Sequence, residues 1–239
     1  HTQKVISEEN RASARKSVAP EKTYGFVAVG VGEGVRGVFT DLGVDQLVEG
    51  GQTMNPSTQD ILAAIDQTPA EVVFVFPNNK NIIMAAQQTV DLSDKQVVVI
   101  PTRSMPQGIS ALLAFDQDAT VEANIEALSA AASRVKTGSI TYAARDSEFD
   151  GHAIASGEYL ALNESKLSSN GTELSAVASK LLDQMQVSDC GFITIFYGEG
   201  VTEQDAAVVE AICKEKAPNA EVMLLDGGQP VYYYIISAE

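Results

Sequence analysis

Hydroxyl, amide and glycine residues gather in four short segments of the first half of the chain, each between an apolar run and a helical pattern. The segments are GVGEG (30–34), GGQTMNPST (50–58), FPNNKN (76–81) and PTRSMPQG (101–108). In a parallel α/β sheet such junctions lie at the carboxyl ends of the strands, where helix N-termini present free N–H groups. Glycines admit a ligand close to the backbone, hydroxyl and amide groups give directional hydrogen bonds, and a cation fixes an anion. We therefore expect a ligand at this edge, with these candidate binding residues: Thr53, Asn55, Ser57, Asn78, Asn79, Lys80, Arg103 and Ser104.

The same residues also have purely structural explanations. Ser57 followed by Asp60 is a variant of the capping box that starts a helix. Asn79, and Thr102 or Ser104, are suited to cap the next two helices. The prolines of these segments can end strands or begin helices. Both interpretations remain open from the sequence.

Two further glycine-rich segments are candidates for ligand contact. DGGQPVYYY (226–234) is a near echo of GGQTMNPST and adds Gln229 to the candidate binding residues. GEGVRG (32–37) matches the G-x-G-x-x-G pattern of dinucleotide-binding folds, and Glu49 ends the next short strand, where a ribose-binding acid could lie. The same pattern also occurs in plain glycine-rich turns, which is the alternative interpretation.

Residues suited to catalysis or metal binding are sparse. His152 is the one histidine beyond His1, and no Ser or Cys elbow motif stands beside it. Cys190 and Cys213 form no CxxC pair, so we expect no zinc site and two reduced core cysteines of a cytoplasmic protein. The acidic turn DSEFD (146–150) could bind a cation or be a solvated loop. We assign no catalytic residue, metal or cofactor to this chain.

The elements that must position these residues alternate between strand and helix. Residues 1–22 are polar and are predicted to be a linker or a poorly ordered extension. Apolar β-branched runs between helical patterns then favour a parallel sheet covered on both faces, which gives a three-layer lobe over residues 23–115. Its predicted strands and helices are 24–30, 34–43, 45–50, 57–68, 71–76, 80–90, 96–101 and 107–115.

The pattern changes after a connecting helix predicted at 116–136. Neighbouring apolar runs at 138–146 and 152–165 suggest antiparallel strands. Helices and strands alternate again toward the C-terminus, so residues 137–239 are predicted to form a mixed α/β lobe. The fold class is therefore α/β, with a mostly parallel lobe followed by a mixed one.

Composition limits the possible partners. The formal net charge is −16, from 16 Lys and Arg against 32 Asp and Glu, so the chain repels nucleic acid and anionic membranes. Solubility or a basic protein partner accounts for this acidity. No apolar run approaches the roughly 20 residues that a transmembrane helix needs. The chain begins with His1 rather than Met, which predicts an excised fragment or a processed product.

Three motifs in this order resemble a known family. GGQTMNPSTQDILAAI, VVFVFPNNKNI and DGGQPVYYYIISAE are similar to the C-terminal region of the bacterial fatty acid kinase catalytic subunit, which is dihydroxyacetone-kinase-like. The resemblance covers about residues 20–239. More distantly, the layout resembles DegV-type fatty-acid-binding proteins, which carry a Thr-Ser-Gln-Pro-Ser-like loop at the place of QTMNPS.

The resemblance implies a two-lobed DegV-like fold and a role inside a larger, homodimeric kinase. That kinase would hold an N-terminal catalytic domain, which binds ATP and magnesium, and a middle dimerisation domain. It would phosphorylate fatty acid held by a separate DegV-type binding protein and so supply acyl phosphate for phospholipid synthesis. This chain would dock or position that carrier and would not catalyse the transfer alone.

The sequence departs from the DegV-type pattern in one respect. DegV-type carriers hold the acyl carboxylate with a loop hydroxyl and a histidine near the C-terminus. Thr53 or Ser57 matches the hydroxyl, whereas GGQPVYYYI has no histidine. Three hypotheses therefore stand: a docking domain; a binder of a lipid or phosphorylated small molecule at the strand-end loops; and a nucleotide-binding enzyme that uses GEGVRG.

Overall fold

The computed structural model describes residues 17–50 and 55–239 and divides the chain into two compact units. The first unit holds the described residues up to Gly30 together with Phe39–Ala130. The second holds Val31–Val38 and Ala131–Glu239. Residues 1–16 of the predicted extension, and Thr53, lie outside the described residues.

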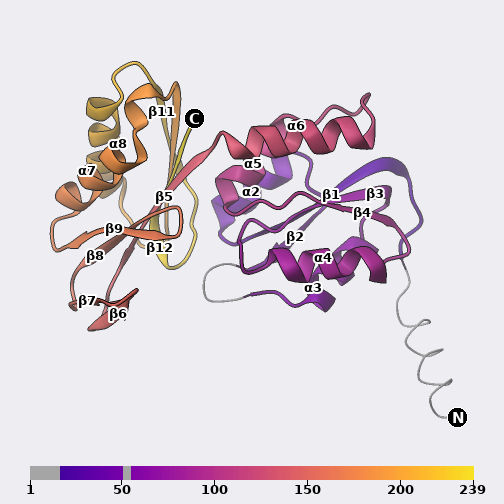
Figure 1. The fold of residues 1–239 in the computed structure, drawn as a ribbon, viewed down its shortest axis with the longest axis horizontal. Helices are drawn as coiled ribbons and strands as arrows, with labels where there is room; N and C mark the ends of the chain where they lie inside the picture. The colour runs from indigo at the N-terminus through magenta and orange to yellow at the C-terminus, as the bar shows by residue number, and fades with distance from the viewer. Residues whose placement is uncertain (1–16, 51–54) are drawn as a thin grey trace, which may run out of the picture. The chain divides into compact units, whose positions relative to one another are not determined.

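The first unit is built on a parallel four-stranded sheet of order β2-β1-β3-β4. Figure 1 shows α3 and α4 on one face of this sheet and α5 and α6 on the other, which confirms the predicted α/β layering. The strands are β1 (Lys22–Gly30), β2 (Gln46–Glu49), β3 (Ala70–Phe76) and β4 (Gln96–Val99). The helices are α2 (Glu33–Asp41), which runs from the second unit into the first, α3 (Thr58–Asp66), α4 (Ile83–Leu92), α5 (Met105–Leu113) and α6 (Val121–Ser133).

Successive side chains of β1 and β3 point to opposite faces of this sheet, and the two faces carry different hydrophobic cores. On one face Val27, Val29, Val73 and Val75 pack with residues of α3 and α4. On the other face aromatic rings meet edge to face, as between Phe26 and Phe115, whose centroids lie 4.8 Å apart. Successive side chains of a strand point to opposite faces, so near-continuous apolar strands fill both cores.

The second unit contains a mixed six-stranded sheet of order β11-β10-β12-β5-β8-β9. β10 and β11 are parallel, and the other neighbours are antiparallel. A separate hairpin is formed by β6 and β7. The elements are β5 (Lys136–Tyr142), β6 (Ser147–Phe149), β7 (His152–Ile154), β8 (Tyr159–Asn163), β9 (Lys166–Gly171), α7 (Leu174–Met185), η1 (Val187–Asp189), β10 (Phe192–Tyr197), α8 (Glu203–Lys216), β11 (Glu221–Asp226) and β12 (Tyr232–Ala238).

Helices α7 and α8 cover one face of this sheet. Ile193, Ile195 and Tyr197 of β10 point into the core that the two helices share with the sheet. Phe192, Thr194 and Phe196 alternate with these residues along β10 and therefore point to the opposite face of the sheet. In the part of the chain that the structure describes, no helix is both long and apolar enough to span a membrane.

Several predicted elements are corrected by the structure. The run 152–165 is two strands rather than one, because the chain turns at Gly157, whose φ of +89° suits glycine. The helix predicted from Lys80 begins at Ile83, and the helix predicted at 116–136 begins at Val121. β9 was not predicted, since KLSSNG has no apolar alternation.

Candidate functional site

The predicted binding edge lies at the carboxyl ends of β2, β3 and β4. Because these strands are parallel, the loops that follow them leave the same edge of the sheet. The candidates Asn55, Ser57, Asn78, Asn79, Lys80, Arg103 and Ser104 all belong to these loops. Their contacts decide what the edge offers to a ligand.

Asn78 ties three strand ends together. Its Nδ2 donates to the Val29 carbonyl at the end of β1 over 2.9 Å, and its Oδ1 accepts from the Thr102 hydroxyl over 2.8 Å. Thr102 Oγ1 in turn accepts from the Asn78 backbone N–H. Asn78 has a φ of 57°, a left-handed conformation that asparagine tolerates better than most residues. A Cβ at Gly108 would lie 2.2 Å from Asn78 Oδ1, so the amide is closely confined.

The hydroxyls at this edge cap helices. Ser57 Oγ accepts from the Asp60 N–H while Asp60 accepts from the Ser57 N–H, so the predicted capping box is present at the start of α3. Hydrogen bonding of the Asp60 carboxylate with Ser57, chiefly with its backbone N–H and then with its side chain, lowers the pKa of Asp60. Ser104 Oγ accepts from the Gln107 N–H at the start of α5.

Asn79 does not cap a helix as predicted. The N-cap position of α4 is Ile82, and the buried Asn79 side chain accepts instead from the Asn81 N–H over 2.9 Å. This local bond holds the loop in a turn and delays the helix start, which explains why α4 begins after Lys80.

Three candidates keep their side chains exposed. Asn55, Lys80 and Arg103 all face solvent, and Arg103 contributes its backbone N–H to Gln107 Oε1. The edge therefore offers two exposed cations, Lys80 and Arg103, to a ligand. Most of its amide and hydroxyl groups are already hydrogen-bonded within the protein. Exposed charges of this kind attract anions without building a desolvated pocket.

Gln229 belongs to the second unit and is 3% exposed. Its Nε2 donates to the carbonyls of Phe196 and Tyr232, over 3.0 and 3.1 Å. Its Oε1 is buried and has no hydrogen-bond partner among the described residues. The side chain thus fastens the loop between β11 and β12 to the end of β10.

The glycines of GEGVRG have a structural role within the second unit. The N–H groups of Gly34 and Val35 at the start of α2 both donate to the Gly227 carbonyl, each over 3.1 Å. A Cβ at Gly34 would lie 1.7 Å from the Asp226 carbonyl oxygen. These helix N–H groups are therefore already bonded to backbone, at the place where a dinucleotide fold would bind phosphate.

The remaining candidates for chemistry are dispersed. His152 is exposed on β7, as predicted for a strand residue. Cys190 and Cys213 are free and buried, as expected, and burial raises the pKa of Cys213 to about 12. Among the described residues, no group of three or more His, Cys, Asp or Glu could hold a metal ion.

An aromatic cluster in the second unit was missed from the sequence. Tyr142 and Tyr233 stack with centroids 5.9 Å apart, and Tyr159 meets Tyr142 edge to face. Burial raises the pKa of Tyr159, with a further contribution from Asp205. The consecutive tyrosines at 232–234 were a usable signal, but they predicted only a strand.

Comparison with known proteins identifies the family. Residues 25–239 match the family model for the C-terminal domain of FakA-like fatty acid kinase proteins. The chain belongs to this family. It is 42% identical to protein YloV of Bacillus subtilis over 236 residues. The matched segment is 98% of this chain and 42% of YloV. An uncharacterized protein of Staphylococcus aureus is 37% identical over 235 residues, again 98% of this chain and 42% of the relative. The FakA-like chain thus spans well under half the length of these relatives.

Solved structures similar to this chain include DegV family proteins, a fatty acid kinase B3 protein and a dihydroxyacetone kinase. A DegV family protein from Corynebacterium glutamicum has a TM-score of 0.65 at 14% identity, over 90% of this chain and 96% of that one. The fatty acid kinase B3 protein of Streptococcus pneumoniae, loaded with linoleic acid, has a TM-score of 0.64 at 13% identity, over 91% and 99%. The dihydroxyacetone kinase of C. freundii has a TM-score of 0.61 at 13% identity, over 90% of this chain and 48% of that one. The FakA-like chain therefore has a DegV-like fold.

Proposed function

We propose that this chain is the docking domain of a fatty acid kinase catalytic subunit. It binds a DegV-type acyl carrier and presents the carried fatty acid to a kinase domain that lies elsewhere in a homodimeric, cytoplasmic protein. That kinase domain, with ATP and magnesium, would phosphorylate the fatty acid and supply acyl phosphate for phospholipid synthesis. The chain itself would take no part in the chemistry.

The match of residues 25–239 to the FakA-like C-terminal family carries this proposal. Relatives of more than twice the length leave room for the kinase and middle domains. The structural neighbours include a fatty acid kinase B3 protein, which is itself loaded with a fatty acid. A domain related in fold to the carrier is therefore proposed to bind it.

The contacts at the strand ends support docking over lipid binding by this chain. Asn78 and Thr102 bond to each other, and Ser57 and Ser104 cap helices. Gln229 is directed to two backbone carbonyls. An acyl carboxylate would have to compete with these bonds, and breaking a buried bond leaves a partner unsatisfied at about 1–3 kcal/mol.

Exposed apolar side chains supply a surface on which to test the proposal. Phe192 on β10 and Met223 on β11 are 58% and 57% exposed. The parallel register pairs Thr194 with Met223, which places both apolar side chains on the sheet face opposite α7 and α8. Aromatic and methionine side chains are enriched at protein interfaces.

The experiment is isothermal titration calorimetry of the chain with a DegV-type carrier loaded with fatty acid. We expect saturable binding that a Phe192→Ser, Met223→Ser double variant weakens at least about tenfold. Val208→Ser is the matched control, since Val208 is also exposed but lies on α8.

The full-length kinase provides the decisive comparison. A deletion of the region equivalent to this chain should abolish carrier binding and leave nucleotide binding unchanged. Failure of the chain to bind the carrier, while the deletion variant still binds it, would overturn the proposal.

A further inference from the structure

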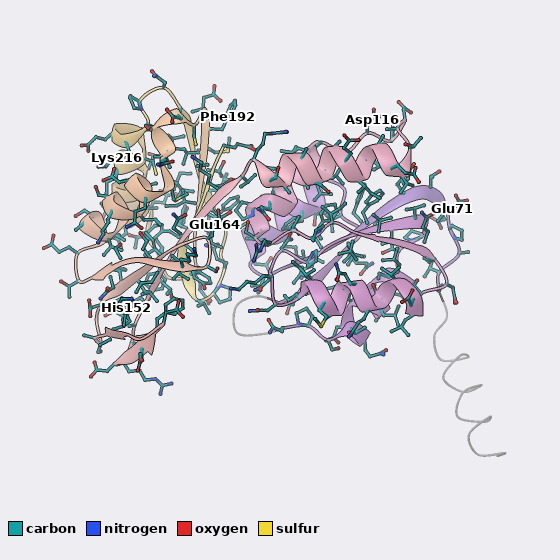
Figure 2. All side chains as sticks on the ribbon, viewed as in Figure 1. Glu71, Asp116, His152, Glu164, Phe192 and Lys216 are labelled. Carbon is teal, nitrogen blue, oxygen red and sulfur yellow. The ribbon has the colours of Figure 1, made fainter. Side chains whose placement is uncertain are left out.

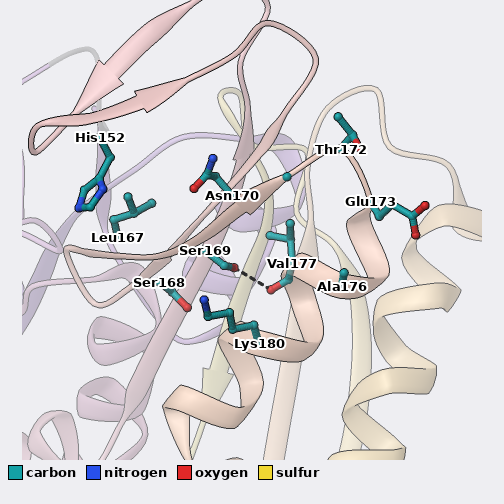
Figure 3. Close-up of a pocket in the computed structure, with 11 residues that line it drawn as sticks. His152, Leu167, Ser168, Ser169, Asn170, Thr172, Glu173, Ala176, Val177 and Lys180 are labelled. Carbon is teal, nitrogen blue, oxygen red and sulfur yellow. Dashed lines mark hydrogen bonds between the residues drawn. The ribbon is translucent and has the colours of Figure 1, made fainter.

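A cavity of about 500 Å³ opens on the second unit, and none of the candidate binding residues lines it. Its walls are β9 and the first two turns of α7, and His152 of the β6–β7 hairpin stands at one side (Figure 3). Cavities of this size accommodate small-molecule ligands. The cavity was not predicted, because β9 itself was not predicted from the sequence.

Three hydrogen-bond donors of this cavity have no partner in the described part of the chain. The side chains of Lys180 on α7 and of His152 make no ion pair or hydrogen bond there, although both belong to an acidic chain of net charge −16. The Ser168 hydroxyl is buried and unpaired. In Figure 3 the ammonium end of Lys180 is directed toward Ser168, and His152 lies beside Leu167.

The other polar groups of the lining are already engaged or point away. Ser169 Oγ donates to the Val177 carbonyl over 3.1 Å, which anchors β9 to α7. Asn170 Nδ2 donates to Glu158 Oε2 over 2.8 Å and so occupies the nearby carboxylate. Glu173, the one acid of the lining, extends away from Lys180 in Figure 3.

The backbone adds positive potential on the same side. Glu173 is the N-cap residue of α7 and makes no side-chain capping bond. The first-turn N–H groups of a twelve-residue helix therefore face this wall without a cap from that side chain. This contribution is secondary to Lys180 and Ser168, which carry the inference.

We infer that the cavity binds a small phosphorylated molecule. Lys180 pairs with the phosphate, the Ser168 hydroxyl donates to a phosphate oxygen, and His152 contacts the outer end of the ligand. Lysine is a common phosphate-binding residue, and a bound acceptor would satisfy a hydroxyl that is otherwise buried without a partner.

The test uses ¹H–¹⁵N NMR of the whole chain titrated with inorganic phosphate, glycerol 3-phosphate, pyrophosphate and acetate. We expect saturable shifts of the amides of Ser168–Ala176 and of the His152 imidazole, and weaker or no shifts with acetate. A larger response to glycerol 3-phosphate than to inorganic phosphate would assign the site to an organic phosphate, and the reverse would assign it to the free ion.

Variants distinguish phosphate binding in the cavity from non-specific attraction to surface lysines. Lys180→Gln should weaken phosphate binding at least about tenfold, and Ser168→Ala should weaken it in a protein with unchanged spectra elsewhere. Lys166→Gln is the matched control, because Lys166 is an exposed lysine of β9 that does not line the cavity. It should leave the affinity unchanged.

Two results would overturn the inference. One is the absence of saturable shifts with any phosphate probe, and the other is an equal loss of affinity in Lys180→Gln and Lys166→Gln. Carrier docking is measured with a different ligand and different variants, so either proposal can fail while the other stands.

Discussion

Replacement of Asn78 by alanine tests whether the strand-end loops are fastened to each other or open to a ligand. The change removes the bonds from Asn78 Nδ2 to Val29 and from the Thr102 hydroxyl to Asn78 Oδ1. Thr102 is 0% exposed, so its hydroxyl would lose a buried partner. Two such bonds contribute about 2 kcal/mol, and alanine in a left-handed conformation costs about 1 kcal/mol more. We expect Asn78→Ala to lower the free energy of unfolding by about 3 kcal/mol.

Urea unfolding followed by circular dichroism measures this change, and hydrogen exchange of the β1, β3 and β4 amides assigns it to the first unit. Asn78→Gly should lose about 1 kcal/mol less than Asn78→Ala, because glycine adopts positive φ freely. Asn81→Ala is the matched control, since the Asn81 side chain is exposed and the bond to Asn79 uses the Asn81 backbone N–H, which alanine keeps.

A Thr102→Val variant completes a double-mutant cycle with Asn78→Ala. Because the two side chains share a hydrogen bond, we expect a coupling energy of about 1 kcal/mol or more. If Asn78→Ala stays within about 0.5 kcal/mol of the parent protein, the amide does not hold the strand ends. That result would refute the reasoning and restore Asn78 as a free ligand-binding group.

Three other predictions concern capping, close packing and titration. Ser57→Ala should cost about 1 kcal/mol in thermal or urea unfolding, because it removes the hydroxyl half of the capping box. Gly34→Ala should cost more than about 3 kcal/mol, since its Cβ would collide with the Asp226 carbonyl. Gly37→Ala, with no atom within 4 Å of the new Cβ, should be neutral or stabilising in the same assay, and equal effects of the two would contradict the packing argument. Burial raises the pKa of Cys213 from 9.0 to about 12, so its contribution to stability is complete below pH 9 and falls as the pH rises toward 12. Cys213→Ala should reduce the fall in the free energy of unfolding between pH 9 and 12 by up to about 1.4 kcal/mol per pH unit. An unchanged dependence on pH would contradict the raised pKa of Cys213.

Local signals in the sequence predicted the features that depend on few neighbouring residues. The capping box of Ser57 and Asp60 spans three positions, and the buried strands show their apolar runs directly. The polar strand β9 gave no such signal, because a strand at the edge of a sheet need not be apolar. The cavity beside it was missed for the same reason.

The roles of the predicted site residues depended on distant parts of the chain. Asn78 bonds to residues 24 and 49 positions away, and nothing in FPNNKN distinguishes such a fastening from a ligand contact. The glycines of GEGVRG match a phosphate-binding pattern, yet their partner is the Gly227 carbonyl. Pattern alone identifies which residues can approach a neighbour closely, and only the fold shows what that neighbour is.

Figure 2 draws the side chains of the described residues. The bond from the Gly34 N–H to the Gly227 carbonyl needs none of them, because it joins backbone atoms. The contact also has a consequence for the order of folding. Residues 31–38 belong to the second unit, but the next residues to be synthesised, 39–130, belong to the first. The second unit therefore cannot be completed on the ribosome until its last loop, at 227–231, has emerged. A segment starting at Ala131 would also lack the partner of that loop, so the second unit cannot be excised intact as one continuous piece of chain.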